Sequence, residues 1–246
     1  FGTILKGVII TDMKGNIIHQ INRIKGLSSN TILAMHYSKN GKLWLGLDYG
    51  ISSLFLDNNL TYFYDYRGDF GTGFVANRID DMFYLGTNQG LYYCSWNNLN
   101  NNEAFTNFKL VSGTEGQVWS LLQHDNQLFI GHDQGLYSLQ NEKLSVINYQ
   151  DGIWAITPYK NFLLAGSYNG ISIFEKSQGK WVFLKKMDLI FGSCNQLLLH
   201  NGFLWVNIPN YGMIRVELDN SLSPKNQNIF PQNIFKRNNT YLLEKN

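Results

Sequence analysis

Aromatic side chains recur at a fixed spacing in this sequence and are the residues best suited to bind a ligand. Phe74, Trp119 and Trp154 each lie 12 residues before a glycine of a repeated motif. Polar residues lie a few positions before two of them: Glu115, Gln117 and Asp151. Aromatic faces stack on the C–H faces of sugar rings, and carboxylates and carboxamides bond sugar hydroxyls. The pattern predicts an oligosaccharide site, and the alternative is that these aromatic residues pack as ordinary core.

Three tyrosines form a second candidate group. Tyr49, Tyr168 and Tyr211 lie within two residues of a glycine in short polar segments that are typical of hairpin turns. Such turns require glycine, asparagine or aspartate, but they do not require tyrosine. We therefore expect the tyrosines to contribute to a contact surface for a ligand, a partner domain or a second subunit.

The residue types that support metal or nucleophilic chemistry do not form a motif. The five histidines are dispersed without metal-ligand spacing, and Cys94 and Cys194 lack the paired spacing of a zinc site. We expect two buried, unreactive thiols, no metal, no cofactor and no catalytic residue. An enzyme acting on carbohydrate stays as a lesser alternative, because propellers assemble sites from residues far apart in sequence.

The overall composition excludes several classes of protein. Of the 246 residues, 44% are hydrophobic and 15% charged, so the chain can bury a core and is not a disordered polar tract. The formal net charge is +2 and no run of five like charges occurs, which argues against contact with nucleic acid. No apolar stretch approaches the length of a membrane-spanning helix.

The elements that must position the candidate residues belong to an internal repeat. Each copy has a short apolar run, a glycine, three residues, a second glycine and another apolar run. The copies are LWLGLDYGISSL (43–54), FYLGTNQGLYYC (83–94), LFIGHDQGLYSL (128–139), LLAGSYNGISIF (163–174) and, more loosely, LWVNIPNYGMIRV (204–216). The opening FGTILKGVII is a truncated sixth copy. Each copy predicts a β-hairpin, and the period is near 40 residues.

Flanking strands extend each hairpin to a four-stranded unit. TILAMHYS (31–38) and VWSLLQH (118–124) precede hairpins, whereas LTYFYDY (60–66) and KWVFLKK (180–186) follow them. The first hairpin strands are apolar on both faces, as expected for a sheet pressed between two others. Helical periodicity is nearly absent, so a solenoid with helices is disfavoured. Four strands per 40 residues predict a β-propeller blade.

The number of blades and the closure of the ring stay open at this stage. Five repeats with half-blades at both ends give about six blades if the ends close, with residues 233–243 against the opening strands. The alternative is a slice of a larger propeller. Two segments are expected to be surface loops: 95–108, which is rich in asparagine, and 217–228, which contains a proline. Aligning the repeats puts Ala34 and Asn195 in the same column as the three aromatic residues.

The segment GLSSNTILAMHYSKNGKLWLGLDYGISSL (26–54) resembles the two-component regulator propeller repeat. That resemblance implies an extracytoplasmic sensor region of a hybrid two-component system or of a related helix-turn-helix regulator. It further implies a periplasmic location, ligands that are commonly glycan fragments, and no catalytic residue.

Together these observations predict that residues 1–246 form a single all-β propeller domain belonging to a longer chain. Its expected function is non-catalytic sensing of a small molecule or oligosaccharide in signal transduction and transcription regulation. The expected partners are flanking domains of the same chain and a second copy in a homodimer. A protein–protein interaction or dimerisation platform is the alternative function.

Overall fold

The computed structural model describes residues 1–56, 65, 68–99, 108–149, 151–231 and 233. The chain divides into two compact units. The first comprises Phe1–Asp69 and Leu99–Thr106, and the second comprises Phe70–Asn98 and Asn107–Asn246. Whether the whole chain forms a single propeller domain stays a prediction.

The first unit contains two antiparallel sheets. Strands β1 (Val8–Thr11) and β2 (Ile17–Ile21) form a hairpin, which is followed by a 3-10 turn at Arg23–Lys25. Strands β3 (Ile32–Tyr37), β4 (Lys42–Leu47) and β5 (Gly50–Phe55) form a three-stranded sheet. The core between the two sheets consists of Val8, Leu27, Ile32, Leu45 and Leu47. The first repeat therefore forms the hairpin that its pattern predicts.

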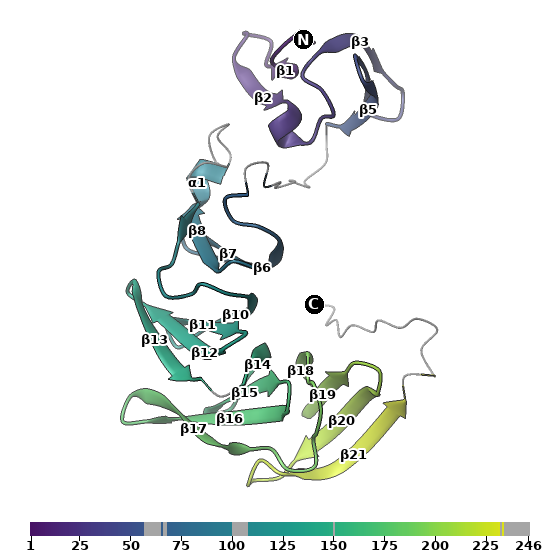
Figure 1. The fold of residues 1–246 in the computed structure, drawn as a ribbon. Helices are drawn as coiled ribbons and strands as arrows, with labels where there is room; N and C mark the ends of the chain where they lie inside the picture. The colour runs from purple at the N-terminus through teal and green to yellow at the C-terminus, as the bar shows by residue number, and fades with distance from the viewer. Residues whose placement is uncertain (57–64, 66–67, 100–107, 150, 232, 234–246) are drawn as a thin grey trace. The chain divides into compact units, whose positions relative to one another are not determined.

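The second unit contains four sheets of four antiparallel strands, which follow one another in chain order (Figure 1). The first sheet is β6 (Gly73–Ile79), β7 (Met82–Thr87), β8 (Leu91–Ser95) and β9 (Lys109–Leu110). The second is β10 (Val118–His124), β11 (Gln127–His132), β12 (Gly135–Gln140) and β13 (Lys143–Asn148). The third is β14 (Ile153–Tyr159), β15 (Phe162–Ser167), β16 (Gly170–Ser177) and β17 (Lys180–Lys186). The fourth is β18 (Gln196–His200), β19 (Phe203–Ile208), β20 (Gly212–Leu218) and β21 (Pro224–Pro231).

Neighbouring sheets of the second unit pack through their first strands, as in propeller blades. Strand β10 lies beside β6 and β14, and β14 lies beside β18. Separate apolar cores fill the three junctions. The central strands β11 and β15 are almost wholly buried, which confirms the prediction that both of their faces are covered. The all-β propeller architecture is therefore confirmed.

The two glycines of the repeat have different structural roles. The second glycine, as at Gly170 (φ +87°), adopts a left-handed conformation that ends the tight turn. The first glycine instead provides space between blades. A Cβ on Gly166 would lie 2.3 Å from the Cys194 carbonyl oxygen of the next sheet, and one on Gly131 would lie 2.6 Å from the Ile153 oxygen. The first glycine is thus needed for the close approach of two backbones.

Three expectations require comment. The loop predicted at 217–228 is wrong, because the second half of this segment belongs to β21. Pro224 is the first residue of this edge strand, where its missing N–H leaves no ladder bond unmade. The segment 95–108 begins with a short helix, α1 (Trp96–Leu99), and 100–107 lie outside the described residues. The predicted strand 60–66, apart from residue 65, and the closing segment 234–243 also lie outside them.

Candidate functional site

A β-bulge recurs in the first strand of four sheets and positions the aromatic column. In β10 the register passes from Val118 to Ser120, so Trp119 is the extra residue of the bulge. Three residues occupy the same place in the other sheets: Leu33, Phe74 and Trp154. A bulge bends its strand and turns a side chain away from the regular pleat.

The predicted alignment is therefore wrong for the first repeat, where Leu33 and not Ala34 occupies the column. Strands β3 and β4 are joined by a turn one residue longer than the turns that follow β6, β10 and β14. Counting back from the repeat glycine consequently overshoots the bulge by one position. The correct residue follows only once the strand register is known.

Trp119 and Trp154 stack directly on each other across the junction of two sheets. Their ring centroids are 3.8 Å apart and their planes differ by 9°. The Tyr168 ring meets both edge-on, at 5.8 Å from Trp119 and 5.3 Å from Trp154. Tyr168 lies at the β15–β16 turn and is 47% exposed. The three residues, named the aromatic cluster below, combine a packed interior with an accessible edge.

Polar groups hold the aromatic cluster in place. The Trp119 indole Nε1–H donates to Gln117 Oε1 at 3.1 Å. Gly152 fits beneath the rings, since a Cβ there would lie 2.9 Å from Trp119 and 3.0 Å from Tyr168. The Trp154 Nε1 atom is buried and has no hydrogen-bond partner within the described part of the chain. The cluster thus retains one indole donor that could bond a ligand if the rings rearranged.

Asp151 lies at the centre of a second polar group beside the aromatic cluster. Its Oδ1 accepts from the Asn169 side chain at 2.9 Å, and its Oδ2 accepts from Lys186 Nζ at 2.5 Å. Burial raises the pKa of Asp151, but the bonds from Lys186 and Asn169 lower it further, so its pKa lies below the ordinary value. The carboxylate is therefore ionised and fixed next to Tyr168, whose neighbour in sequence is Asn169.

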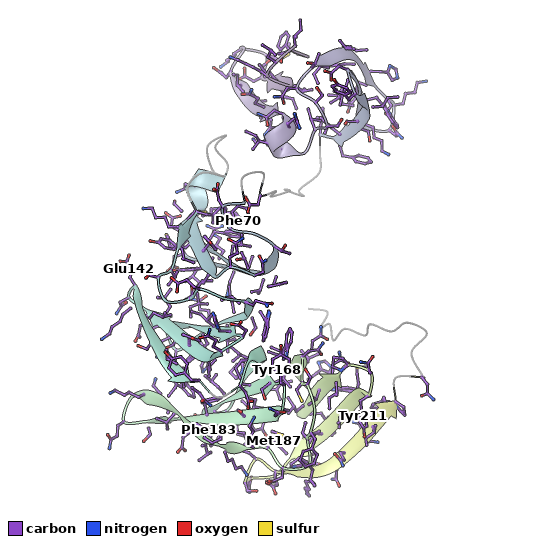
Figure 2. The ribbon with its side chains drawn as sticks, in the orientation of Figure 1. Phe70, Glu142, Tyr168, Phe183, Met187 and Tyr211 are labelled. Atoms are coloured by element: carbon purple, nitrogen blue, oxygen red, sulfur yellow. The ribbon has the colours of Figure 1, made fainter. Side chains whose placement is uncertain are left out.

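The remaining predicted residues do not join the cluster. Glu115 lies exposed in the loop before β10, where hydrogen bonds from its own N–H and that of Gly113 lower its pKa. Phe74 is 48% exposed and makes no ring contact with the cluster among the described residues. Tyr211 is exposed at the β19–β20 turn and lies apart from Tyr168 (Figure 2). Tyr49 is exposed in the first unit.

Residues that the sequence patterns did not indicate complete the site. Lys186 reaches Asp151 from the last strand of its sheet, 35 residues away in sequence. Gly152 has no distinguishing motif. Only the hydrogen-bonding register of β14–β17 reveals that these residues meet the aromatic column.

Solved structures confirm the propeller fold. The chain is 18% identical to the extracellular domain of a protein described as a hybrid two component system, BT4673 of B. thetaiotaomicron, with a TM-score of 0.52. That match covers 85% of this chain and 32% of the other. A second structure of the BT4673 extracellular domain matches at 19% identity and a TM-score of 0.51, covering 85% and 31%. This chain therefore spans about a third of the length of those domains.

Two other comparisons found nothing. No family model matches the sequence, and no curated protein matches it. Within the described ranges, no helix is long and apolar enough to cross a membrane.

Proposed function

We propose that this chain is the ligand-sensing propeller of a periplasmic receptor of the two-component class, and that its ligand is an oligosaccharide. The resemblance of residues 26–54 to the regulator propeller repeat supports the class, and the likeness in fold to the BT4673 extracellular domain is consistent with it. The aromatic cluster is the observation that carries the proposal for the ligand.

The geometry of the cluster defines how a sugar would bind. At 3.8 Å the two indoles leave no room for a ring between them, so a sugar stacks on an outer indole face or on Tyr168. Gln117 and the Asp151–Asn169 pair then lie at the side of the rings, where sugar hydroxyls need partners. Glu115, Phe74, Tyr49 and Tyr211 are secondary candidates, because no contact links them to the cluster.

Signalling follows from the position of the cluster between two sheets. Trp119 belongs to β10 and Trp154 to β14, so a bound ligand contacts two blades at once. We propose that binding shifts the balance between two arrangements of a homodimer and its flanking domains. The shift equals the difference in affinity of the ligand for the two arrangements. No turnover of the ligand is part of this function.

The test is direct binding of a panel of oligosaccharides, measured by thermal shift and calorimetry. A ligand at 100 times its Kd raises the free energy of unfolding by about 2.7 kcal/mol. Trp154→Ala removes one stacking partner and should weaken binding about tenfold, which corresponds to about 1.4 kcal/mol. The matched control is Trp205→Ala, because Trp205 is also half-buried and stacks on an aromatic ring, that of Phe230, at 5.7 Å.

The possible results separate the hypotheses. Equal binding by wild type, Trp154→Ala and Trp119→Ala would place the site elsewhere. A folded chain that binds no oligosaccharide in the panel would refute the sensing of sugars by these blades.

The alternative function is a protein-interaction platform, which one surface favours. Leu189 and Phe191, in the loop between β17 and β18, are 58% and 77% exposed, and the loop is bonded to the Tyr168 turn through Gly170 N–H and the Gly192 oxygen. Concentration-dependent association that Phe191→Ser abolishes, together with no response to sugars, would favour this function.

A further inference from the structure

A buried histidine in the β11–β12 turn lies between a donor and an acceptor that compete for one ring nitrogen. His132 is 1% exposed. Its Nδ1 accepts the Gln134 backbone N–H at 3.1 Å, while Asp133 Oδ1 lies 2.7 Å from the same Nδ1. The other ring nitrogen, Nε2, lies 3.3 Å from the Thr114 carbonyl oxygen.

The two contacts at Nδ1 require different protonation states. A neutral ring protonated on Nε2 donates to Thr114 and accepts from Gln134, but it leaves a lone pair facing the Asp133 carboxylate. A doubly protonated ring donates to both Thr114 and Asp133, but it can no longer accept from Gln134. Asp133 Oδ1 is buried and has no hydrogen-bond partner among the described residues apart from this close approach to the ring. Protonation would therefore satisfy a buried acceptor and release a backbone donor.

The corresponding turns of the neighbouring sheets make the equivalent bond without a titratable group. In the preceding sheet Thr87 Oγ1 accepts from Gln89 N–H at 3.0 Å, and in the following sheet Ser167 Oγ accepts from Asn169 N–H at 3.2 Å. His132 replaces the hydroxyl with an imidazole at the same place in the turn. The turn sequences TNQG (87–90) and HDQG (132–135) differ only at these first two positions.

The titrating turn is bonded directly to the aromatic cluster. Asp133 N–H donates to the Gln117 carbonyl oxygen at 2.9 Å, and the Gln117 side chain holds the Trp119 indole. The Asp133 carbonyl oxygen also packs on Gly152, where a Cβ would lie 2.8 Å from it. A rearrangement of Asp133 or Gln134 therefore acts on the base of the cluster.

We propose that His132 and Asp133 form a proton-operated switch that changes the position of Trp119. Above the transition, the neutral ring holds Gln134 and the described turn. Below it, the proton on Nδ1 pairs the ring with Asp133, and the Gln134 N–H turns away to another acceptor. Histidine is the side chain that ordinarily changes charge between about pH 5 and 8, so the switch works within that range.

Other charged groups near the ring are few in the described structure. Glu115 interacts electrostatically with His132 from the loop before β10. The Tyr137 ring of β12 lies 4.9 Å from the imidazole and carries no charge in this pH range, and Tyr149 packs against Tyr137 at 5.9 Å. Gly116 lies against the ring, since a Cβ at that position would lie 2.8 Å from the His132 Cε1 atom. Asp133 is thus the charged group in direct contact with the ring.

The experiment follows tryptophan fluorescence of the whole chain from about pH 8 to pH 5 without any ligand. We expect a one-proton transition in the wild type. The matched control is the double variant His132→Thr with Asp133→Asn, which recreates the TNQG turn already present at 87–90 and should lose that transition. The same transition in the double variant, or none in the wild type, would overturn the proposal.

A second measurement does not depend on the folding of the variant. Long-range proton–nitrogen spectra of histidine-labelled wild type report which ring nitrogens are protonated. One buried histidine should change from the neutral form protonated on Nε2 to the cation across the fluorescence transition. Spectra in which every ring that titrates is solvent-exposed would overturn the proposal.

The effect of the switch on ligands rests on the proposed function, whereas the ligand-free titration does not. Oligosaccharide affinity measured near the two ends of the transition, at about pH 5.5 and 7.5, should differ in the wild type and not in the double variant. A working switch in a chain that binds no oligosaccharide would refute the proposed function alone.

Discussion

Gly166→Ala tests the claim that the first glycine of the repeat exists to let two blades approach. The added Cβ would lie 2.3 Å from the Cys194 carbonyl oxygen, where ordinary contacts begin at 3.4 Å. The obstacle is backbone, so it cannot rotate away, and the first strand of the next sheet must retreat by about 1 Å. The buried side chains between these sheets, including Ile171, Ile173 and Val206, would lose close packing with it.

The expected cost is at the upper end of the range for overpacked cores, about 3 kcal/mol. For a chain of this size that corresponds to a fall in Tm of roughly 6–12 °C. Gly179→Ala is the control, because Gly179 lies in an exposed turn at φ +79° with nothing within 4 Å of a Cβ. It should lose only about 1–2 kcal/mol of backbone strain. Differential scanning calorimetry at neutral pH compares the two. If Gly166→Ala were no less stable than Gly179→Ala, the inter-blade explanation would be refuted.

Two further predictions concern buried ionisable groups. Burial raises the pKa of Cys94 to about 11 and that of Cys194 to about 12, so neither thiol should react with Ellman's reagent in the native chain at about pH 8, and both should react in urea. Asp151, although burial raises its pKa, has a net lowered value because of Lys186 and Asn169, so its carboxylate stabilises the fold above about pH 4, the unfolded value. That contribution is lost as the pH falls through the folded value, so wild type and Asp151→Asn should differ in urea midpoint at about pH 7 and converge towards about pH 3.

Each of these predictions has a clear contrary result. Fast labelling of either cysteine without denaturant would mean that its sheet opens locally. A difference between wild type and Asp151→Asn that stays constant down to about pH 3 would show that the side chain acts through its shape and not through its charge.

The repeat made most of the fold predictable from sequence, because hairpin glycines and apolar runs report on local geometry. The strands predicted at 118–124 and 180–186 match β10 and β17 residue for residue. The edge strand β21 was missed because its sequence, PKNQNIFP, is polar and starts with proline. An edge strand exposed to solvent needs neither apolar alternation nor every N–H, so its sequence looks like that of a loop.

The candidate site was predictable only in part, for a different physical reason. Counting from the glycine placed Trp119 and Trp154 at equivalent positions, but it could not show that the two rings stack on each other. That contact depends on the separation of two blades, which is set by residues such as Gly131, whose Cβ would strike the Ile153 carbonyl oxygen. The partnership of Asp151 with Lys186 likewise depends on the register of four strands. Contacts between sheets are properties of packing, and a single sequence does not encode them in any local pattern.

The same packing explains why the turn beneath the cluster is suited to regulation. A propeller blade tolerates change at its turns, since the ladder bonds of β11 and β12 end at His132 and Gly135. The turn is nevertheless in contact with the next blade through Asp133, which bonds Gln117 and packs on Gly152. A small change in the turn is therefore transmitted across the junction without disturbing either sheet. In the neighbouring turn, Thr87 satisfies the same backbone donor with a hydroxyl that does not titrate, so the imidazole at His132 adds sensitivity to protons without removing a hydrogen bond from the neutral state.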